Sequence, residues 1–197
     1  AQSNLFRSID PNFLLEPSQG ASGTELSDVT FSIDLLEMDV AGVGPLTLLD
    51  TGLSREQIER SDTHLSRLIS DVDLVSDPVE PGDGDGFDGE ALDHGDICDA
   101  GNVFASVSWH GPSLASRAGL TQTPDAARLI GARLASGRIS GRCGATLADV
   151  IDGLAWASGQ SVIDTGEAQL AIPEPSSVIL LPFNAPGPCP LSLQSAI

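Results

Sequence analysis

A nearly continuous apolar run, Leu46–Leu49, ends abruptly at the polar triplet Asp50-Thr51-Gly52. A short run of this kind, bounded by turn-forming residues, is typical of a strand that is buried on both faces, as in a parallel sheet. Residues 127–134 and 177–181 carry similar patterns and predict two further strands, the second of them also buried. We therefore expect several short strands that share one buried sheet.

Helical spacing of apolar residues occurs between these strands. The clearest example is residues 146–158, where Thr146 and Asp149 resemble a capping box and Gly159 suits the C-terminal cap. Residues 54–70 and 113–118 predict shorter helices, the second opening with Pro112 in its first turn. The alternation predicts an α/β fold with a parallel sheet flanked by helices.

The chain has 197 residues, which is enough for one domain with an extension. We predict an irregular N-terminal extension over residues 1–42, with short apolar islands that allow one strand, and an α/β domain over residues 43–197. Residues 76–102 are dominated by Gly, Asp and Pro, which predicts a long loop. Loops of that length in compact domains are usually functional or disordered.

The formal net charge is −19, and all nine basic residues are Arg. A field of this sign repels phosphate backbones and anionic lipid head groups, so we expect neither nucleic-acid binding nor membrane-surface binding. The acidity fits a secreted protein, a salt-adapted protein or a cation binder. No apolar run reaches the length of a membrane-spanning helix. The start Ala1-Gln2-Ser3 fits the end left by signal-peptide removal, so we expect a secreted or cell-surface protein.

Three cysteines, Cys98, Cys143 and Cys189, form no C-x-x-C pair, so the usual zinc spacing is not present. Their odd number allows one disulfide and one remaining thiol. We prefer a bond between Cys98 and Cys143, and the alternative is three buried free thiols.

Two residues are the strongest candidates for chemistry. Asp50 follows a predicted strand, and in open α/β sheets sites form at the carboxyl ends of strands. His110 precedes a predicted helix, where a buried carboxylate can hold one ring nitrogen and leave the other free as a general base. Taken singly, Asp50 fits a turn aspartate that closes a strand equally well, and a lone histidine such as His110 is more often structural than catalytic.

Four segments in order resemble the subtilisin-like serine proteases, over roughly residues 43–160. Leu48-Leu49-Asp50-Thr51-Gly52 resembles the strand that ends in D-T-G, and His110-Gly111-Pro112-Ser113-Leu114-Ala115 the helix that begins H-G-T-x-V-A. The two remaining segments resemble a strand, A-P-x-A-x-L-x-x-V-R-V, and a helix, S-x-x-D-V-I-x-G-I-x-W-A. They are residues 124–134 and 146–157.

The resemblance implies a peptidase that acts on peptides or proteins, with His110 as general base and Asp50 as its orienting carboxylate. Residues 177–184 resemble the family strand that ends in an oxyanion-hole asparagine, which would be Asn184. Pro112 departs from the family threonine, and no G-T-S-M-A segment with the nucleophilic serine occurs. We therefore expect an endopeptidase chain that is inactive alone and takes its serine from outside residues 1–197, for example from a second chain.

The acidic loop provides a separate candidate site. Asp83, Asp85, Asp88 and Asp93 cluster in a Gly-rich stretch that can supply the oxygen ligands of Ca²⁺, although their spacing is not that of an EF-hand. The first three are the ligands that we predict. A solvated acidic loop explains the same pattern. The alternative function is thus a non-catalytic, acidic, calcium-binding secreted or structural module with a protease-like core, and an unrelated α/β protein is the third possibility.

Overall fold

The computed structural model describes most of the predicted α/β domain together with one short N-terminal segment. Its described ranges are residues 14–17, 44–61, 68–77, 86–94, 110–117, 133–141, 144–166, 168–184 and 190–196. The fold and the site below are built from these residues.

A four-stranded parallel sheet forms the centre of the molecule. Strand β2 (Leu46–Asp50) lies between β4 (Leu134–Arg138) and β9 (Val178–Leu180), and β3 (Leu68–Asp73) pairs with the other edge of β4. All three pairings are parallel, with Asp50 opposite Arg138 in the register of β2 and β4. The predicted parallel sheet is therefore confirmed.

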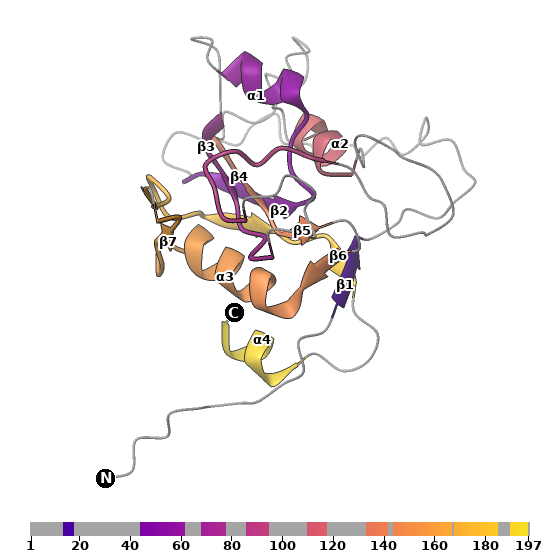
Figure 1. Ribbon diagram of the computed structural model, residues 1–197, viewed down its shortest axis with the longest axis vertical. Coiled ribbons are helices and arrows are strands. Elements are labelled where there is room, and N and C mark those ends of the chain that lie inside the picture. Colours follow the sequence, from indigo (N-terminus) through magenta and orange to yellow (C-terminus); the bar gives the residue numbers. More distant parts are fainter. Residues whose placement is uncertain are drawn as a thin grey trace, which may run out of the picture.

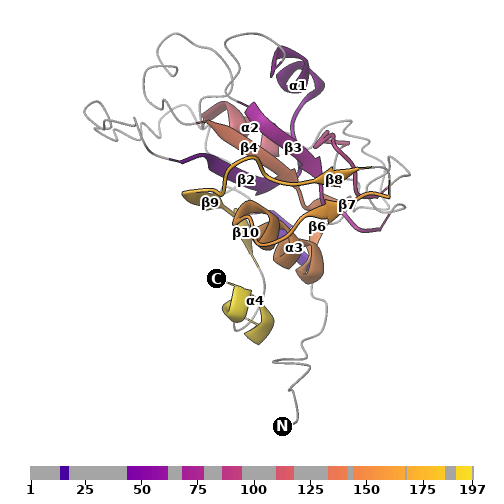
Figure 2. The same cartoon turned by 90° about the vertical axis from the view of Figure 1, so that its left-hand side faces the viewer.

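Helices cover both faces of this sheet (Figure 1). Helices α1 (Arg55–Ser61) and α2 (His110–Arg117) lie on one side, and α3 (Leu147–Ala157) lies on the other. The view turned by 90° shows the same three layers, with α2 behind β4 and α3 below the strands (Figure 2). This arrangement is the expected α/β architecture.

Successive residues of β2 point into two different cores, because side chains alternate across a strand. Leu48 packs with Leu53, Ala115 and Leu134 on the α2 side. Leu49 packs with the larger cluster on the α3 side. Both leucines are fully buried, which explains why this strand is apolar at consecutive positions.

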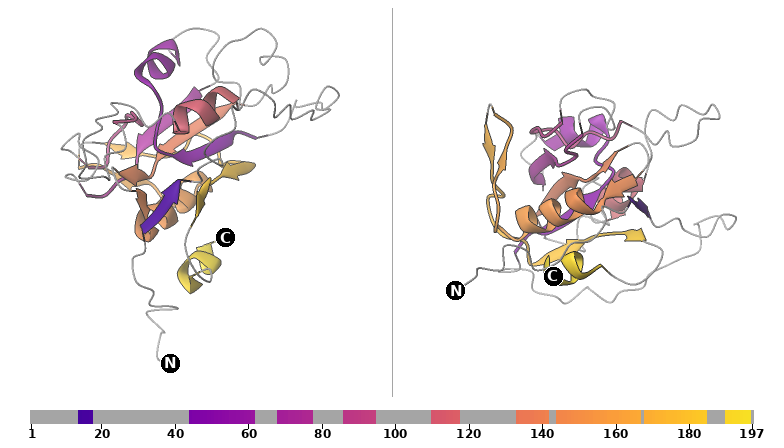
Figure 3. Two further views of the ribbon diagram at one scale, coloured as in Figure 1. Left: turned by 90° about the vertical axis from the view of Figure 1, so that its right-hand side faces the viewer. Right: turned by 60° about the horizontal axis from the view of Figure 1, so that its bottom comes forward.

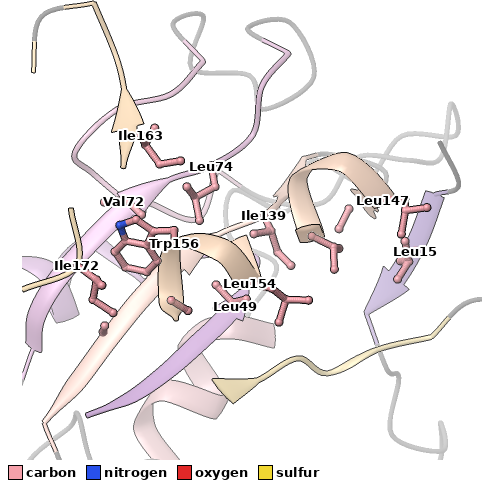
Figure 4. Close-up of a cluster of buried hydrophobic side chains, with 14 residues drawn as sticks. Leu15, Leu49, Val72, Leu74, Ile139, Leu147, Leu154, Trp156, Ile163 and Ile172 are labelled. Atoms are coloured by element: carbon pink, nitrogen blue, oxygen red, sulfur yellow. The ribbon is translucent and has the colours of Figure 1, made fainter. Parts of the chain in front are cut away.

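The larger core fills the space between the sheet and α3 (Figure 4). Trp156 is the largest fully buried side chain, and Figure 4 shows it beside Val72, Leu74 and Ile172. Gly153 faces the sheet at the point where an added Cβ would lie 2.9 Å from Ile139 Cγ2, so the close approach of α3 to the strands requires a glycine there.

Helix α3 begins and ends as the sequence predicts. The Asp149 amide donates to Thr146 Oγ1 at 3.2 Å, and Thr146 Oγ1 donates to a carboxylate oxygen of Asp149 at 2.7 Å. After Ser158, Gly159 has a φ of 72°, the left-handed conformation that favours glycine at a helix end.

Smaller elements surround the central sheet (Figure 3). A second sheet has the order β10-β1-β6-β5, and β7 and β8 form a separate antiparallel pair. Helix α4 packs beside α3 through Leu193. The bounds of these elements are β1 Leu14–Pro17, β5 Ser140–Gly141, β6 Gly144–Thr146, β7 Ile163–Asp164, β8 Gln169–Leu170, β10 Phe183–Asn184 and α4 Leu191–Ala196.

Strand β1 lies inside the segment that we predict to be an N-terminal extension. It pairs antiparallel with both β6 and β10, and Leu15 is buried in the larger core. The predicted apolar island is therefore a strand of the same packed body. The boundary at residue 42 itself stays a prediction.

Three expectations for individual elements need correction. The helix predicted over residues 54–70 ends at Ser61, and Leu68 and Ile69 belong to β3, because pairing with β4 outweighs their helical spacing. The strand predicted over residues 127–134 runs from Leu134 to Arg138, and residues 127–132 lie outside the described part. The strand at 177–181 exists but is not buried on both faces, since Val178 is 48% exposed at the sheet edge.

Candidate active site

Asp50 is the last residue of β2 and lies at the carboxyl end of a central strand. Its side chain is fully buried. One carboxylate oxygen, Oδ1, accepts a hydrogen bond from the Thr51 amide at 2.7 Å. No donor from the described residues reaches the other oxygen, Oδ2, which is also buried.

His110 is the first residue of α2, on the face of the sheet opposite α3. Its Nδ1 atom lies 2.7 Å from Asp50 Oδ1, although sixty residues separate the two in the chain. The imidazole is 21% exposed and the carboxylate 1%. The pair therefore has a shielded carboxylate and a ring that reaches the surface.

Burial dominates the electrostatics of Asp50. Loss of hydration raises the pKa of this carboxyl group above its ordinary value, and the nearby charge of Asp93 acts in the same direction. The hydrogen bond and the charge of His110, together with the Thr51 amide, lower the pKa and offset part of that shift. A buried carboxylate bonded to the ring nitrogen of a histidine is suited to stabilise the imidazolium that forms when the histidine takes up a proton.

Two glycines allow α2 to approach the end of β2. An added Cβ at Gly111 would lie 2.2 Å from the Gly52 carbonyl oxygen, so only a glycine fits beside that backbone. Gly52 has a φ of 108°, and a Cβ there would meet the Ala91 carbonyl oxygen at 2.6 Å. The D-T-G and H-G sequences are thus in contact with each other through their glycines.

The hydroxyl group of Thr51 links these segments to a third one. The Gly111 amide donates to Thr51 Oγ1 at 3.0 Å, and Thr51 Oγ1 donates to Asp93 Oδ2 at 3.3 Å. Both contacts are buried. Sequence reasoning placed Asp93 only in the acidic Gly-rich loop considered for calcium, because nothing in the sequence pairs it with Thr51, 42 residues away.

The other candidate residues lie away from the Asp50–His110 pair or outside the described part of the chain. Asn184 is an exposed residue of β10, paired with Glu16 of β1, and so belongs to a different sheet from Asp50. Asp88 is half-buried and its Oδ1 accepts a bond from the Glu90 amide at 2.8 Å. Outside the described residues lie Asp83, Asp85, Cys98, Cys143 and Cys189.

Within the part of the chain that is described, no group of three or more His, Cys, Asp or Glu side chains is arranged to hold a metal ion. The acidic loop is only partly covered by that statement, because Asp83 and Asp85 are not included. The calcium expectation therefore stays a prediction.

Comparison with known proteins identifies relatives of this chain. It is 32% identical, over 202 aligned residues, to an extracellular protease of Xanthomonas campestris pv. campestris. It also matches the structure of a protease from Pseudoalteromonas arctica PAMC 21717, with a TM-score of 0.60 and 28% identity. The chain is homologous to extracellular proteases. No protein-family model matches it.

The similarity covers nearly all of this chain but only part of each relative. The alignment with the Xanthomonas protease includes 98% of this chain and 33% of the protease. The structural match includes 79% of this chain and 45% of the Pseudoalteromonas protein. The chain therefore spans between a third and a half of the length of these proteases.

Helices long and apolar enough to cross a membrane are not found among the described residues.

Proposed function

We propose that this protease-related chain is the Asp- and His-bearing part of a subtilisin-like serine endopeptidase. The observation that supports the proposal is the 2.7 Å contact between Asp50 Oδ1 and His110 Nδ1 at the carboxyl end of a parallel strand. Homology to proteases supports the same reaction class. The nucleophilic serine would come from polypeptide outside residues 1–197.

In this mechanism the buried carboxylate acts on the histidine and not on the substrate. With Nδ1–H bonded to Asp50, neutral His110 carries a lone pair on Nε2, and this nitrogen would take the proton from a serine hydroxyl. The serine oxygen then bonds to the peptide carbonyl carbon. His110 returns the proton to the leaving amine, and a water molecule repeats the sequence to release the acyl group.

We also propose Asn184 as the oxyanion donor. It follows β9 in the chain by four positions, and β9 lies next to the strand that ends in Asp50. Its present pairing in β10 leaves the side chain exposed. An oxyanion role would therefore require the serine-bearing segment to complete the site around it.

The substrate and the location follow from the same homology. We propose that the complete enzyme hydrolyses peptide bonds in proteins outside the cell, since one homologue is named an extracellular protease. The net charge of −19 fits an exported protein of this type and opposes binding to nucleic acid or anionic membranes.

The test uses an active-serine fluorophosphonate probe and intact-mass analysis. The native protein, with any polypeptide that remains attached to it, should react on the serine-bearing segment. His110→Ala should abolish labelling, whereas His64→Ala, which alters a histidine without a neighbouring family motif, should not. The chain of residues 1–197 alone should give no labelled product.

A result in which the assembled protein carries a serine segment but reacts equally well with His110→Ala would refute the proposed mechanism. A preparation that contains only the 20.3 kDa chain, with no serine-bearing partner in any native source, would instead favour the non-catalytic calcium-binding module. Calcium binding by the acidic loop is the measurement for that alternative.

A further inference from the structure

The Thr51 hydroxyl group lies between a donor and an acceptor of fixed type. The Gly111 amide can only donate, and it lies 3.0 Å from Thr51 Oγ1. The Asp93 carboxylate can only accept when ionised, and its Oδ2 lies 3.3 Å from the same oxygen. The hydroxyl proton must therefore point toward Asp93, which turns a lone pair of the oxygen toward Gly111.

Asp93 is held rigidly enough to set that orientation. Its amide donates to the Leu53 carbonyl at 2.8 Å, and the Leu53 amide donates to the Ala91 carbonyl at 2.7 Å. Leu53 and Leu92 form a parallel bridge, and Asp93 is only 4% exposed. The segment Ala91–Asp93 is thus attached to the backbone that follows Asp50.

The other end of the chain of hydrogen bonds lies next to His110. Gly111 is its immediate neighbour in the first turn of α2, and it lies against the Gly52 backbone with no room for a Cβ. The hydrogen bond that the Gly111 amide donates to Thr51 Oγ1 therefore fixes the position of the helix start. That position determines where His110 Nδ1 lies relative to Asp50.

We propose that Asp93 is a positioning residue for His110, acting through the Thr51 hydroxyl and the Gly111 amide. It acts through these two groups and, in the proposed mechanism, does not touch the substrate. The catalytic meaning of this role rests on the proposed function, but the geometric effect on His110 does not. Asp50, on β2, and Asp93 are the carboxylates on either side of Thr51, and the buried ion pair of Arg138 with Asp73 lies at the same end of the sheet, on β4 and β3.

The experiment measures the imidazole of His110 by NMR in the ¹⁵N-labelled chain of 197 residues. The chain has three histidines, so His110→Gln identifies the resonance. In the wild type we expect a downfield Nδ1–H proton that is protected from exchange with water by its bond to Asp50. Asp93→Ala should accelerate that exchange about tenfold, as expected for the loss of one buried hydrogen bond.

Conservative variants distinguish the loss of these hydrogen bonds from a general loss of folded structure. Thr51→Val, which keeps the shape and removes the hydroxyl, should accelerate exchange as Asp93→Ala does. Thr51→Ser should stay close to the wild type, and so should Asp93→Asn, because the amide oxygen still accepts from Thr51. Adding Asp93→Ala to Thr51→Val should not accelerate the exchange of the His110 proton any further, because both substitutions interrupt the same series of hydrogen bonds.

Glu90→Gln is the matched control, since it removes one negative charge from the same segment at a side chain that is 50% exposed. It should leave the His110 signal unchanged. An unchanged signal in folded Asp93→Ala, or in Thr51→Val, would overturn the proposal. If Asp93→Ala fails to fold, the contrast between Thr51→Val and Thr51→Ser decides in its place. Failure of fluorophosphonate labelling, by contrast, would count against the proposed function and leave this result intact.

Discussion

His110 Nδ1 lies 2.7 Å from Asp50 Oδ1, and the carboxylate in this pair is fully buried while the ring reaches solvent. Elements from distant parts of the chain create the contact: β2 ends at Asp50, and α2 begins at His110. The geometry is thus a property of the packed sheet and helix, and it has consequences for stability that can be measured.

Asp50→Asn should stabilise the chain at neutral pH by about 1 kcal/mol, because it removes a buried charge whose Oδ2 has no described donor. The pKa of Asp50 is raised in the folded state above that of the unfolded state, so folding takes up a proton between those two pKa values. The ionised Asp50 carboxylate therefore lowers the free energy of unfolding of the wild type at pH values above the folded pKa. Below the unfolded pKa the group is protonated in both states, and this loss disappears.

The difference in the free energy of unfolding between Asp50→Asn and the wild type should therefore decrease as the pH falls toward the ordinary pKa of an aspartate. Urea unfolding of both proteins between pH 3.5 and about 8 measures the difference in the free energy of unfolding. A destabilised variant at neutral pH would show that His110 and the Thr51 amide more than compensate for burial.

Arg138 and Asp73 form a buried ion pair across β4 and β3, and each side chain is 1% exposed. Removing one partner leaves the other charged in the core, so Arg138→Met or Asp73→Asn should each lower the free energy of unfolding by roughly 3–5 kcal/mol. The double variant should lose clearly less free energy of unfolding than the two single variants lose together. Glu90→Gln, which breaks the exposed 3.8 Å pair with Arg55, should cost at most about 0.5 kcal/mol.

Denaturant unfolding monitored by circular dichroism checks this prediction. Additive losses in the double variant would mean that the two charges are stabilised independently of each other.

Gly111→Ala should displace the start of α2, because the new Cβ would lie 2.2 Å from a backbone oxygen that has no side-chain freedom. We expect a loss of roughly 1–3 kcal/mol in stability and a weaker contact between His110 and Asp50. Gly89→Ala is the control, since its Cβ would have its nearest neighbour at 3.9 Å. Thermal unfolding and the His110 Nδ1–H signal measure the two effects; wild-type values for Gly111→Ala would contradict the close approach.

The acidic loop should bind Ca²⁺ if the predicted ligands Asp83, Asp85 and Asp88 converge. Calorimetric titration of the chain with CaCl₂ should show binding that the triple substitution to Ala abolishes. Substitution of the acidic residues Asp77 and Asp164 to Asn serves as the charge control. Equal calcium affinity in the triple variant would exclude these ligands.

Local patterns were sufficient for much of the fold. Helix α3 depends on near neighbours, namely Thr146 with Asp149 at its start and Gly159 at its end, and its bounds match the prediction. The apolar strand β2 and the parallel sheet follow from residues that must be buried on both faces. Asp50 and His110 could be selected because their sequence contexts are short, ordered and shared with a known protease family.

Tertiary structure decided the rest, since the deciding contacts join residues far apart in the chain. Leu68 and Ile69 have helical spacing, but pairing with β4 makes them a strand. Val178 is apolar, yet its strand lies at the edge of the described sheet and exposes it. The sequence places Asp93 in an acidic loop, whereas the tertiary structure attaches it to Leu53 by a backbone hydrogen bond and brings it to Thr51. Short-range preferences are set by a few adjacent residues, whereas strand order, burial and the surroundings of a carboxylate depend on the whole packed chain.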